Sequence, residues 1–263
     1  MSGYVDIHAY VLAGIDDGPS ELEGALAMLR AAAHSGTATL VCTPHVRPDF
    51  PDVDIHELAG RCSELRERIA GEALELDLVC GAELALVWAI DAGPVELALA
   101  SFGQRGTDLL IETPSTTTAG LDSLLYQLRA RGFRITLAHP ERSREFQRDP
   151  APLARLVDQG VLLQINADTL LGHERRSDTS RLGVHLCLEG LVHAIASDGH
   201  RAESWRPITR LAAAAEAAAA LVGPERAQWM TSDAPAAIVS GRELPEPPAI
   251  SARRRRLRLW ARR

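Results

Sequence analysis

Short apolar runs alternate with longer amphipathic segments along most of the chain. The apolar runs are rich in Val, Ile and Leu, which is typical of the buried strands of a parallel sheet. We predict such strands at residues 4–7, 39–42, 76–80, 109–112, 135–138, 161–166 and 192–197. The amphipathic segments predict helices at residues 20–34, 56–74, 120–131, 150–159, 180–189, 207–221, 224–231 and 234–240. Residues 95–100 form a short element of ambiguous type.

Strand–helix alternation of this kind predicts a parallel sheet with its helices outside. Ser20 is a plausible N-cap for the first helix, and Gly36 follows its end. Three prolines interrupt the pattern within residues 243–250, which predicts a linker. We therefore expect one domain over residues 1–242, followed by a Pro-rich linker and an Arg-rich tail over residues 243–263.

Histidines and carboxylates recur where the apolar runs end. The segments that carry them are Asp6-Ile7-His8, Asp16-Asp17-Gly18-Pro19, Thr43-Pro44-His45, Gly81-Ala82-Glu83, Ile111-Glu112-Thr113-Pro114, His139-Pro140-Glu141-Arg142 and Ser197-Asp198-Gly199-His200. In a β/α barrel the carboxyl ends of the strands meet at one mouth, so these side chains are expected to lie together. Imidazole and carboxylate ligands suit Zn, Mn or Fe in the +2 state, and so many of them could hold two or three ions.

Composition narrows the classes of function. The chain has 263 residues and a formal net charge of −7 although it ends in an Arg-rich segment, so its body is acidic and lacks the basic footprint of a nucleic-acid-binding protein. The four cysteines form no CxxC pair, which favours reduced, buried thiols of a cytoplasmic protein. We expect no signal peptide, and no apolar run reaches the ~18 residues that span a bilayer.

Clustered metal ions point to phosphate hydrolysis, because they can polarise P–O bonds and activate a water near neutral pH. No cysteine precedes an arginine in a phosphate-cradling loop, so metal-activated water is the better-supported nucleophile. Arg142 is the first candidate for binding substrate phosphate through a forked pair of hydrogen bonds, and Arg201 and Arg47 are further candidates.

At these motifs the sequence resembles the polymerase-and-histidinol-phosphatase superfamily. Within it, the chain is similar to the bacterial metal-dependent tyrosine phosphatases of capsular and exopolysaccharide gene clusters. That branch opens with Asp-Ile-His-x-His and then Asp-Asp-Gly-Pro/Ala, which here stand as Asp6-Ile7-His8-Ala9-Tyr10 and Asp16-Asp17-Gly18-Pro19. Each motif is short, but their ordered combination is specific and covers roughly residues 3 to 240.

The resemblance implies a distorted (β/α)7 TIM-like barrel with a trinuclear metal site. The metal ligands that it implies are His8, Asp17, His45, Glu83, Glu112, His139, Asp198 and His200. Glu83 and Asp198 would be bridging carboxylates, Arg142 would bind phosphate, and Asp198 or His200 would assist proton transfer. Mn is the expected metal, with Fe and Zn as alternatives. The implied substrate is phosphotyrosine on the Tyr-rich tail of a cognate bacterial tyrosine kinase.

Tyr10 departs from the pattern, because the family has a second histidine at this position. A phenol has a pKa near 10 and binds a divalent ion poorly unless the metal removes its proton. Three outcomes stay open: Tyr10 coordinates as phenolate, water fills the gap, or that metal site is weak or empty.

Several polar residues are interpreted as supporting or structural. The alignment with the family motif prefers Asp17 over Asp16 as the ligand, and Asp16 stays open as the alternative. Asp6 is expected to orient a loop or a neighbouring ligand. Asn166 could face the site or start a turn. The histidines read as structural or surface residues are His34, His56, His173, His185 and His193.

We therefore predict a cytoplasmic metal-dependent protein-tyrosine phosphatase. One alternative is a histidinol-phosphatase-like enzyme that acts on a small molecule. The other is a non-catalytic phosphotyrosine-binding regulator with a metal site degraded at Tyr10. Residues 253–263 could hold the chain to anionic lipid at the inner membrane face or could be a disordered, solubilising end.

Overall fold

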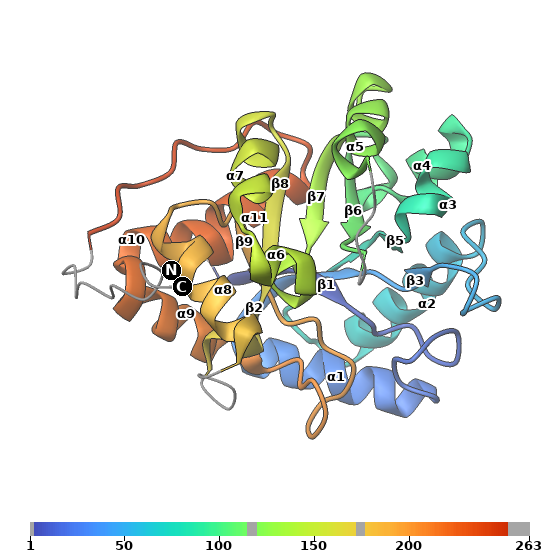
Figure 1. The fold of residues 1–263 in the computed structure, drawn as a ribbon. Helices are drawn as coiled ribbons and strands as arrows, with labels where there is room; N and C mark the ends of the chain where they lie inside the picture. The colour runs from blue at the N-terminus through green and yellow to red at the C-terminus, as the bar shows by residue number, and fades with distance from the viewer. Residues whose placement is uncertain (1–2, 115–119, 172–176, 252–263) are drawn as a thin grey trace.

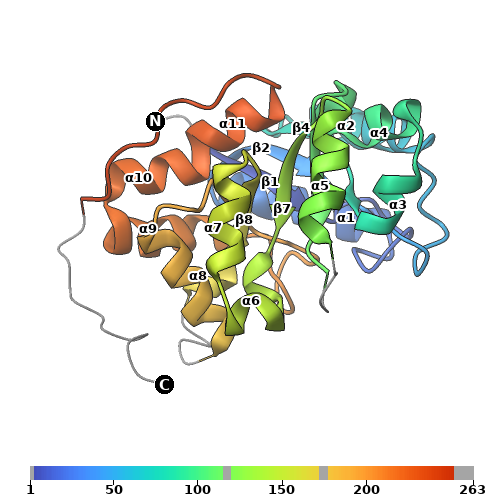
Figure 2. The ribbon, with the colours of Figure 1, turned by 45° about the horizontal axis from the view of Figure 1, so that its top comes forward.

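The computed structural model describes residues 3–114, 120–171 and 177–251. Helices surround a set of parallel strands, with α1 and α2 on one side and α9 and α10 on the other (Figures 1 and 2). The strands are β1 (Tyr4–Ala9), β2 (Thr37–Cys42), β3 (His45–Val46), β4 (Asp77–Cys80), β5 (Glu83–Leu84), β6 (Asp108–Glu112), β7 (Arg134–Ala138), β8 (Leu162–Asn166) and β9 (Ala194–Ala196). The α-helices are α1 (Leu22–His34), α2 (Leu58–Gly71), α3 (Leu86–Asp91), α4 (Pro94–Ala100), α5 (Leu121–Ala130), α6 (Arg144–Arg148), α7 (Ala151–Asp158), α8 (Asp178–Leu188), α9 (Arg210–Val222), α10 (Pro224–Gln228) and α11 (Ala234–Val239).

The described strands form two parallel sheets that together make a distorted, seven-stranded barrel without a continuous closing ladder. One sheet has the order β1-β2-β4 and the other β3-β5-β6-β7-β8-β9, with every pair parallel. Strands β3 and β5 follow β2 and β4 after two-residue interruptions, so each pair continues one barrel strand. A parallel bridge between Ala9 and Gly199 joins β1 to the segment after β9. The predicted fold, a distorted (β/α)7 barrel, is thereby confirmed.

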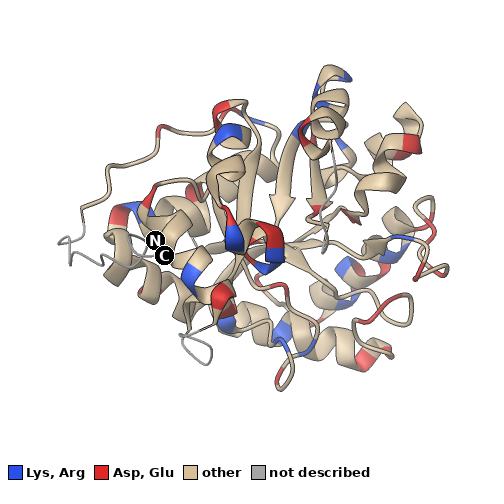
Figure 3. Cartoon of the chain, in the orientation of Figure 1, with Lys and Arg blue, Asp and Glu red and all other residues tan. Residues whose placement is uncertain are grey.

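Apolar side chains from around the barrel fill its interior. The cluster includes Val5 and Ile7 from β1, Val41 from β2, Leu110 from β6 and Phe102, which lies just before β6. A larger apolar layer lies between the strands and the surrounding helices. Charged residues lie mostly on the helices and loops (Figure 3). The burial of apolar side chains on both faces of the strands holds the strands in place. It therefore also fixes the positions of the residues at the strand ends.

Several predicted boundaries were wrong by a few residues. Glu21, not Ser20, is the N-cap of α1, and its side chain makes no capping hydrogen bond. Helix α8 begins earlier than predicted because the Ser177 side chain accepts a hydrogen bond from the Ser180 backbone and so caps it. The ambiguous element at residues 95–100 is helix α4, whose first residue is Pro94.

The four cysteines are free and buried, as predicted. Within the described part of the chain, no helix is long and apolar enough to cross a membrane. His173 and the Arg-rich residues 253–263, which carry predictions made from the sequence, lie outside the described residues.

His193 makes the stability of the barrel sensitive to pH. Its Nδ1 accepts a hydrogen bond from the Leu163 backbone at 3.2 Å, and burial together with Arg226 lowers the pKa of the imidazole to about 4. As pH falls below 6.5, the unfolded chain therefore binds a proton before the native chain does. We expect His193 to reduce the free energy of unfolding by about 2 kcal/mol between pH 7 and pH 5.

Urea denaturation of the wild type and of His193→Asn at the two pH values measures this effect. The Asn side chain can still accept the Leu163 hydrogen bond but does not titrate. The variant should therefore lose less stability than the wild type on acidification. Equal losses in the two proteins would contradict the prediction.

Candidate metal centre

The predicted ligand residues meet at the carboxyl end of the barrel strands. His8 lies on β1, His45 on β3, Glu83 on β5 and Glu112 at the end of β6. The other four lie on the loops that follow a strand, and they are Asp17, His139, Asp198 and His200. Contacts among their side chains, described below, connect all eight. The structure thus brings together every residue of the predicted ligand set.

One group is built around the carboxylate of Glu83. Its Oε1 lies 2.9 Å from Nε2 of His139 and 3.5 Å from Nε2 of His8. Nε2 of His8 also lies 3.8 Å from Oδ1 of Asp198. All four side chains are buried. The ligand atoms of His8, Glu83 and His139 lie within 4.8 Å of one another, so they can share an ion.

A second group joins Asp17, His45 and His200. Oδ1 of Asp17 lies 3.3 Å from Nε2 of His200 and 3.6 Å from Nε2 of His45. This oxygen is buried and has no hydrogen-bond partner among the described residues. Both oxygens of Asp16 already accept hydrogen bonds, from the Gly18 and His45 backbone, and Asp16 is in none of the three ligand groups. The geometry therefore favours Asp17 over Asp16 as the ligand.

Glu112 belongs to a third group with His45 and Glu83, whose ligand atoms also lie within 4.8 Å of one another. Its carboxylate is paired with Nη1 of Arg47, at 3.1 and 3.3 Å. Arg47 contacts Asp49 as well. Arg47 thus neutralises a carboxylate of the group, and its guanidinium forms ion pairs with both Glu112 and Asp49.

The electrostatics of the centre suit a cation. Burial alone would raise the pKa of Glu83, but His8, His139 and His45 hold it well below the usual range. The pKa of Asp198 is also lowered, because the nearby His8, His139 and Arg206 outweigh its burial. The unpartnered oxygen of Asp17, aimed between two imidazoles, is the atom that an ion would satisfy. The donor set of imidazole nitrogens and carboxylate oxygens therefore fits divalent Mn, Fe or Zn.

A hydrogen-bonded chain on β8 supports two of these residues. Oε1 of Gln164 accepts from Nδ1 of His8 at 2.9 Å, which leaves Nε2 of His8 facing Glu83. Gln164 donates to Asn166, and Asn166 donates to Oδ2 of Asp198. Glu141 in turn accepts from the Asn166 backbone and from Thr169. Asn166 therefore faces the site, which is one of the two predictions made for it from the sequence.

The roles of Gln164 and Glu141 were missed in the sequence. Gln164 and Asn166 are two residues apart on one strand and so point to the same face, which was the signal available. Asp6 acts on the backbone, as predicted, because its Oδ1 accepts from Ser197 and His8. His34, His56, His185 and His193 lie in none of the three ligand groups.

The backbone at the site adopts conformations that are costly for ordinary residues. His139 and Asp198 have φ values of 37° and 52°, in the left-handed region. Between Asp198 and His200, a Cβ on Gly199 would lie 2.8 Å from Cα of Ile208. A Cβ on Gly18 would lie 2.7 Å from the carbonyl oxygen of Tyr10. These two glycines let the ligand loops pack closely.

A cavity of about 470 Å³ opens beside Asp198. Three arginines line it, Arg142, Arg206 and Arg210, together with Trp205, whose side chain is largely exposed. Nη1 of Arg142 lies 3.4 Å from Oδ2 of Asp198. Arg142 is thus placed where the sequence predicted a phosphate-binding arginine.

Arg206 was missed because it stands in no motif. Its Nη1 lies 3.3 Å from Oδ2 of Asp198 and 3.3 Å from Nε2 of His200. Arg201, which was predicted to bind substrate, donates instead to the backbone carbonyls of Asp17 and His200, at 2.8 and 2.7 Å. Its described contacts therefore hold two ligand loops together.

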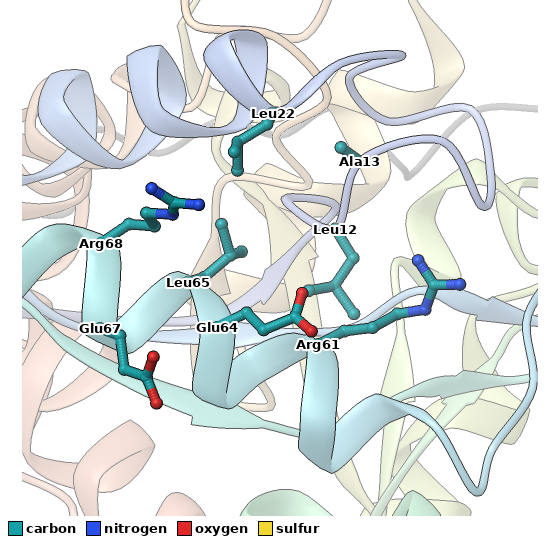
Figure 4. Close-up of a pocket in the computed structure, with 8 residues that line it drawn as sticks. All are labelled: Leu12, Ala13, Leu22, Arg61, Glu64, Leu65, Glu67 and Arg68. Carbon is teal, nitrogen blue, oxygen red and sulfur yellow. The ribbon is translucent and has the colours of Figure 1, made fainter.

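Another pocket, of about 430 Å³, lies between helix α2 and the segment that precedes α1 (Figure 4). Its lining residues are Leu12, Ala13, Leu22, Arg61, Glu64, Leu65, Glu67 and Arg68. None of these is a predicted site residue. The cavity beside Asp198 is therefore the candidate substrate site.

Comparison with known proteins identifies the family. Residues 4–240 match the family described as "Capsular polysaccharide synthesis, CpsB/CapC". The chain belongs to this family, as the resemblance predicted.

Curated relatives agree with this assignment. The tyrosine-protein phosphatase YwqE of Bacillus subtilis is 27% identical over 201 residues, which cover 76% of this chain and 78% of the relative. The putative tyrosine-protein phosphatase CapC of Staphylococcus aureus is 30% identical, over 74% of this chain and 76% of the relative. The tyrosine-protein phosphatase CpsB of Streptococcus pneumoniae is 25% identical, over 89% of this chain and 98% of the relative.

Solved structures show that the chain shares its fold with known proteins. A chain from a study of YwqE and CpsB, described as "unique metal-dependent tyrosine phosphatases", matches with a TM-score of 0.80 and 27% identity, over 95% of this chain and 100% of that one. The lactonase Lmo2620 from Listeria monocytogenes matches with a TM-score of 0.56 at 12% identity, which is a likeness of fold alone. The predicted class of enzyme, a metal-dependent tyrosine phosphatase, is confirmed by the relatives.

Proposed function

We propose that this chain hydrolyses phosphotyrosine in a protein substrate, using divalent ions held by His8, Asp17, His45, Glu83, Glu112, His139, Asp198 and His200. The observation that carries the proposal is the convergence of this ligand set beside the arginine-lined cavity. Mn is the proposed metal. When bound, such ions polarise a phosphate and lower the pKa of a water.

The residues around the cavity would perform the recognition. Arg142 and Arg206 both point a guanidinium at Asp198 and would fork hydrogen bonds to the phosphate oxygens. Their charges would also stabilise the negative charge that develops during phosphoryl transfer. We further propose that Asp198 or His200 moves the proton, since both line the same edge of the centre.

The family name supports a more specific setting. We propose that the substrate is the Tyr-rich tail of a cognate tyrosine kinase of polysaccharide synthesis, and that the chain acts in the cytoplasm. Residues 253–263 would contact the anionic inner face of the membrane, close to such a kinase. In this proposal, residues 1–242 form the enzyme domain and residues 243–263 the linker and tail.

Hydrolysis of a phosphotyrosine peptide with added Mn tests the proposal. We expect the wild type to release phosphate, a chelator to stop the reaction, and fresh Mn to restore it. His200→Ala should lower turnover by at least about 100-fold, because it removes a ligand and a neighbour of Asp198.

Two other results would point elsewhere. Faster hydrolysis of histidinol phosphate than of the peptide would favour the small-molecule phosphatase. Tight binding of the peptide without any release of phosphate would favour the non-catalytic regulator.

A further inference from the structure

Tyr10 lies inside the metal centre, at the position where the family has a histidine. Its side chain is 1% exposed and comes directly after β1. Its ring packs against two imidazoles, with ring centroids 4.4 Å from His45 and 4.1 Å from His200. Burial and these two ring contacts hold the hydroxyl in place.

The hydroxyl reaches the atoms that would bind an ion. It donates to Oε2 of Glu83 at 2.7 Å and lies 2.8 Å from Nε2 of His8. Because Nδ1 of His8 bonds Gln164, Nε2 is the nitrogen that His8 can offer to a metal. Asp198 completes this corner, with its Oδ1 3.8 Å from the same nitrogen.

Side-chain length explains this placement. A tyrosine is longer than a histidine, so its oxygen extends beyond the point where an imidazole nitrogen would stop. It therefore enters the space that an ion bound to that nitrogen would fill. Nε2 of His8 and Oε2 of Glu83, which would otherwise face such an ion, both face the hydroxyl. A protonated phenol is a poor ligand for a divalent ion, so the hydroxyl keeps an ion from this corner.

We infer that the Tyr10 hydroxyl takes the place of one divalent ion, so that this chain holds two ions where the resemblance implies three. This inference rests on the metal centre of the proposed function. The hydroxyl satisfies the Glu83 carboxylate by a hydrogen bond instead of a metal bond. The two remaining ions lie in the groups that do not include His8, which are Asp17 with His45 and His200, and Glu83 with His45 and Glu112.

Metal content measured by mass spectrometry tests the count without any substrate. The wild type and two variants are saturated with Mn and desalted, and circular dichroism checks that each is folded. We expect two ions in the wild type and three in Tyr10→His, where the shorter side chain opens the space. Tyr10→Phe removes the oxygen but supplies no nitrogen ligand for a third ion, so it should still hold two ions.

Two results would overturn the inference. Three ions in the wild type would show that the hydroxyl does not exclude one. Fewer ions in Tyr10→Phe than in the wild type would show that the oxygen is itself a ligand. The wild-type and Tyr10→Phe counts decide the matter even if Tyr10→His does not fold. Two ions without phosphatase activity would leave the inference standing and reject the proposed function.

Discussion

Replacing Glu83 with Gln is expected to lower turnover of a phosphotyrosine peptide by at least about 1,000-fold, a loss of about 4 kcal/mol of transition-state stabilisation. Glu83 contacts several groups of the centre, with His139 at 2.9 Å, Nδ1 of His45 at 2.7 Å and the Tyr10 hydroxyl at 2.7 Å. The amide keeps the shape of the side chain but removes the charge that opposes the imidazoles. Ions in the centre would then be bound more weakly, and their contribution to phosphate polarisation would be lost.

The measurement combines steady-state kinetics with metal analysis of the same sample. Glu67→Gln, an exposed acid on α2, serves as the matched control and should keep both activity and metal content. If Glu83→Gln retains a tenth of wild-type turnover with its full metal content, Glu83 is not a ligand that the reaction needs.

Replacing Phe102 with Ala is expected to lower the free energy of unfolding by about 3–5 kcal/mol. Phe102 is 1% exposed and packs inside the barrel with residues such as Ile7, Val41 and Leu110. It also lies close to Gly81, where an added Cβ would come within 3.0 Å of the ring. Removing the ring would leave a cavity that the surrounding strands, fixed by their hydrogen bonds, can only partly close.

Urea denaturation with Mn present throughout measures this loss. Val95→Ala is the control, because Val95 is 68% exposed on α4 and its truncation should change stability by less than about 0.5 kcal/mol. A similar loss in both variants would mean that Phe102 does not pack as the structure shows.

The ligand set shows how far a sequence pattern can lead. His8, His45, Glu83 and Glu112 follow apolar runs, and the carboxyl ends of parallel strands meet at one end of a barrel. A local pattern therefore predicted a long-range convergence, because the topology of β/α units leaves little choice. Helix boundaries were predicted less well. Ser20 and Ser177 both have side chains that could cap the helix that follows, but in the structure only Ser177 is an N-cap.

Side-chain contacts between residues far apart in the sequence could not be predicted in this way. Gln164 meets His8 across 156 positions of the chain, and the face that Gln164 shares with Asn166 does not by itself identify His8 as the partner. Arg206 approaches Asp198, whereas Arg201 and Arg47 are engaged elsewhere, although all three are ordinary arginines in the sequence. Which guanidinium faces the cavity depends on the path of a loop, and the sequence pattern does not report that path.

The sequence by itself determined the class of fold, through its strand periodicity, and the candidate ligands of the centre, through residue chemistry together with the resemblance to the family. Only the tertiary structure decided which arginines face the substrate cavity, how β8 supports His8 and Asp198, and where the Tyr10 oxygen lies. These features depend on distances of a few ångströms between segments far apart in the chain, and such distances are set when the strands assemble and the side chains pack.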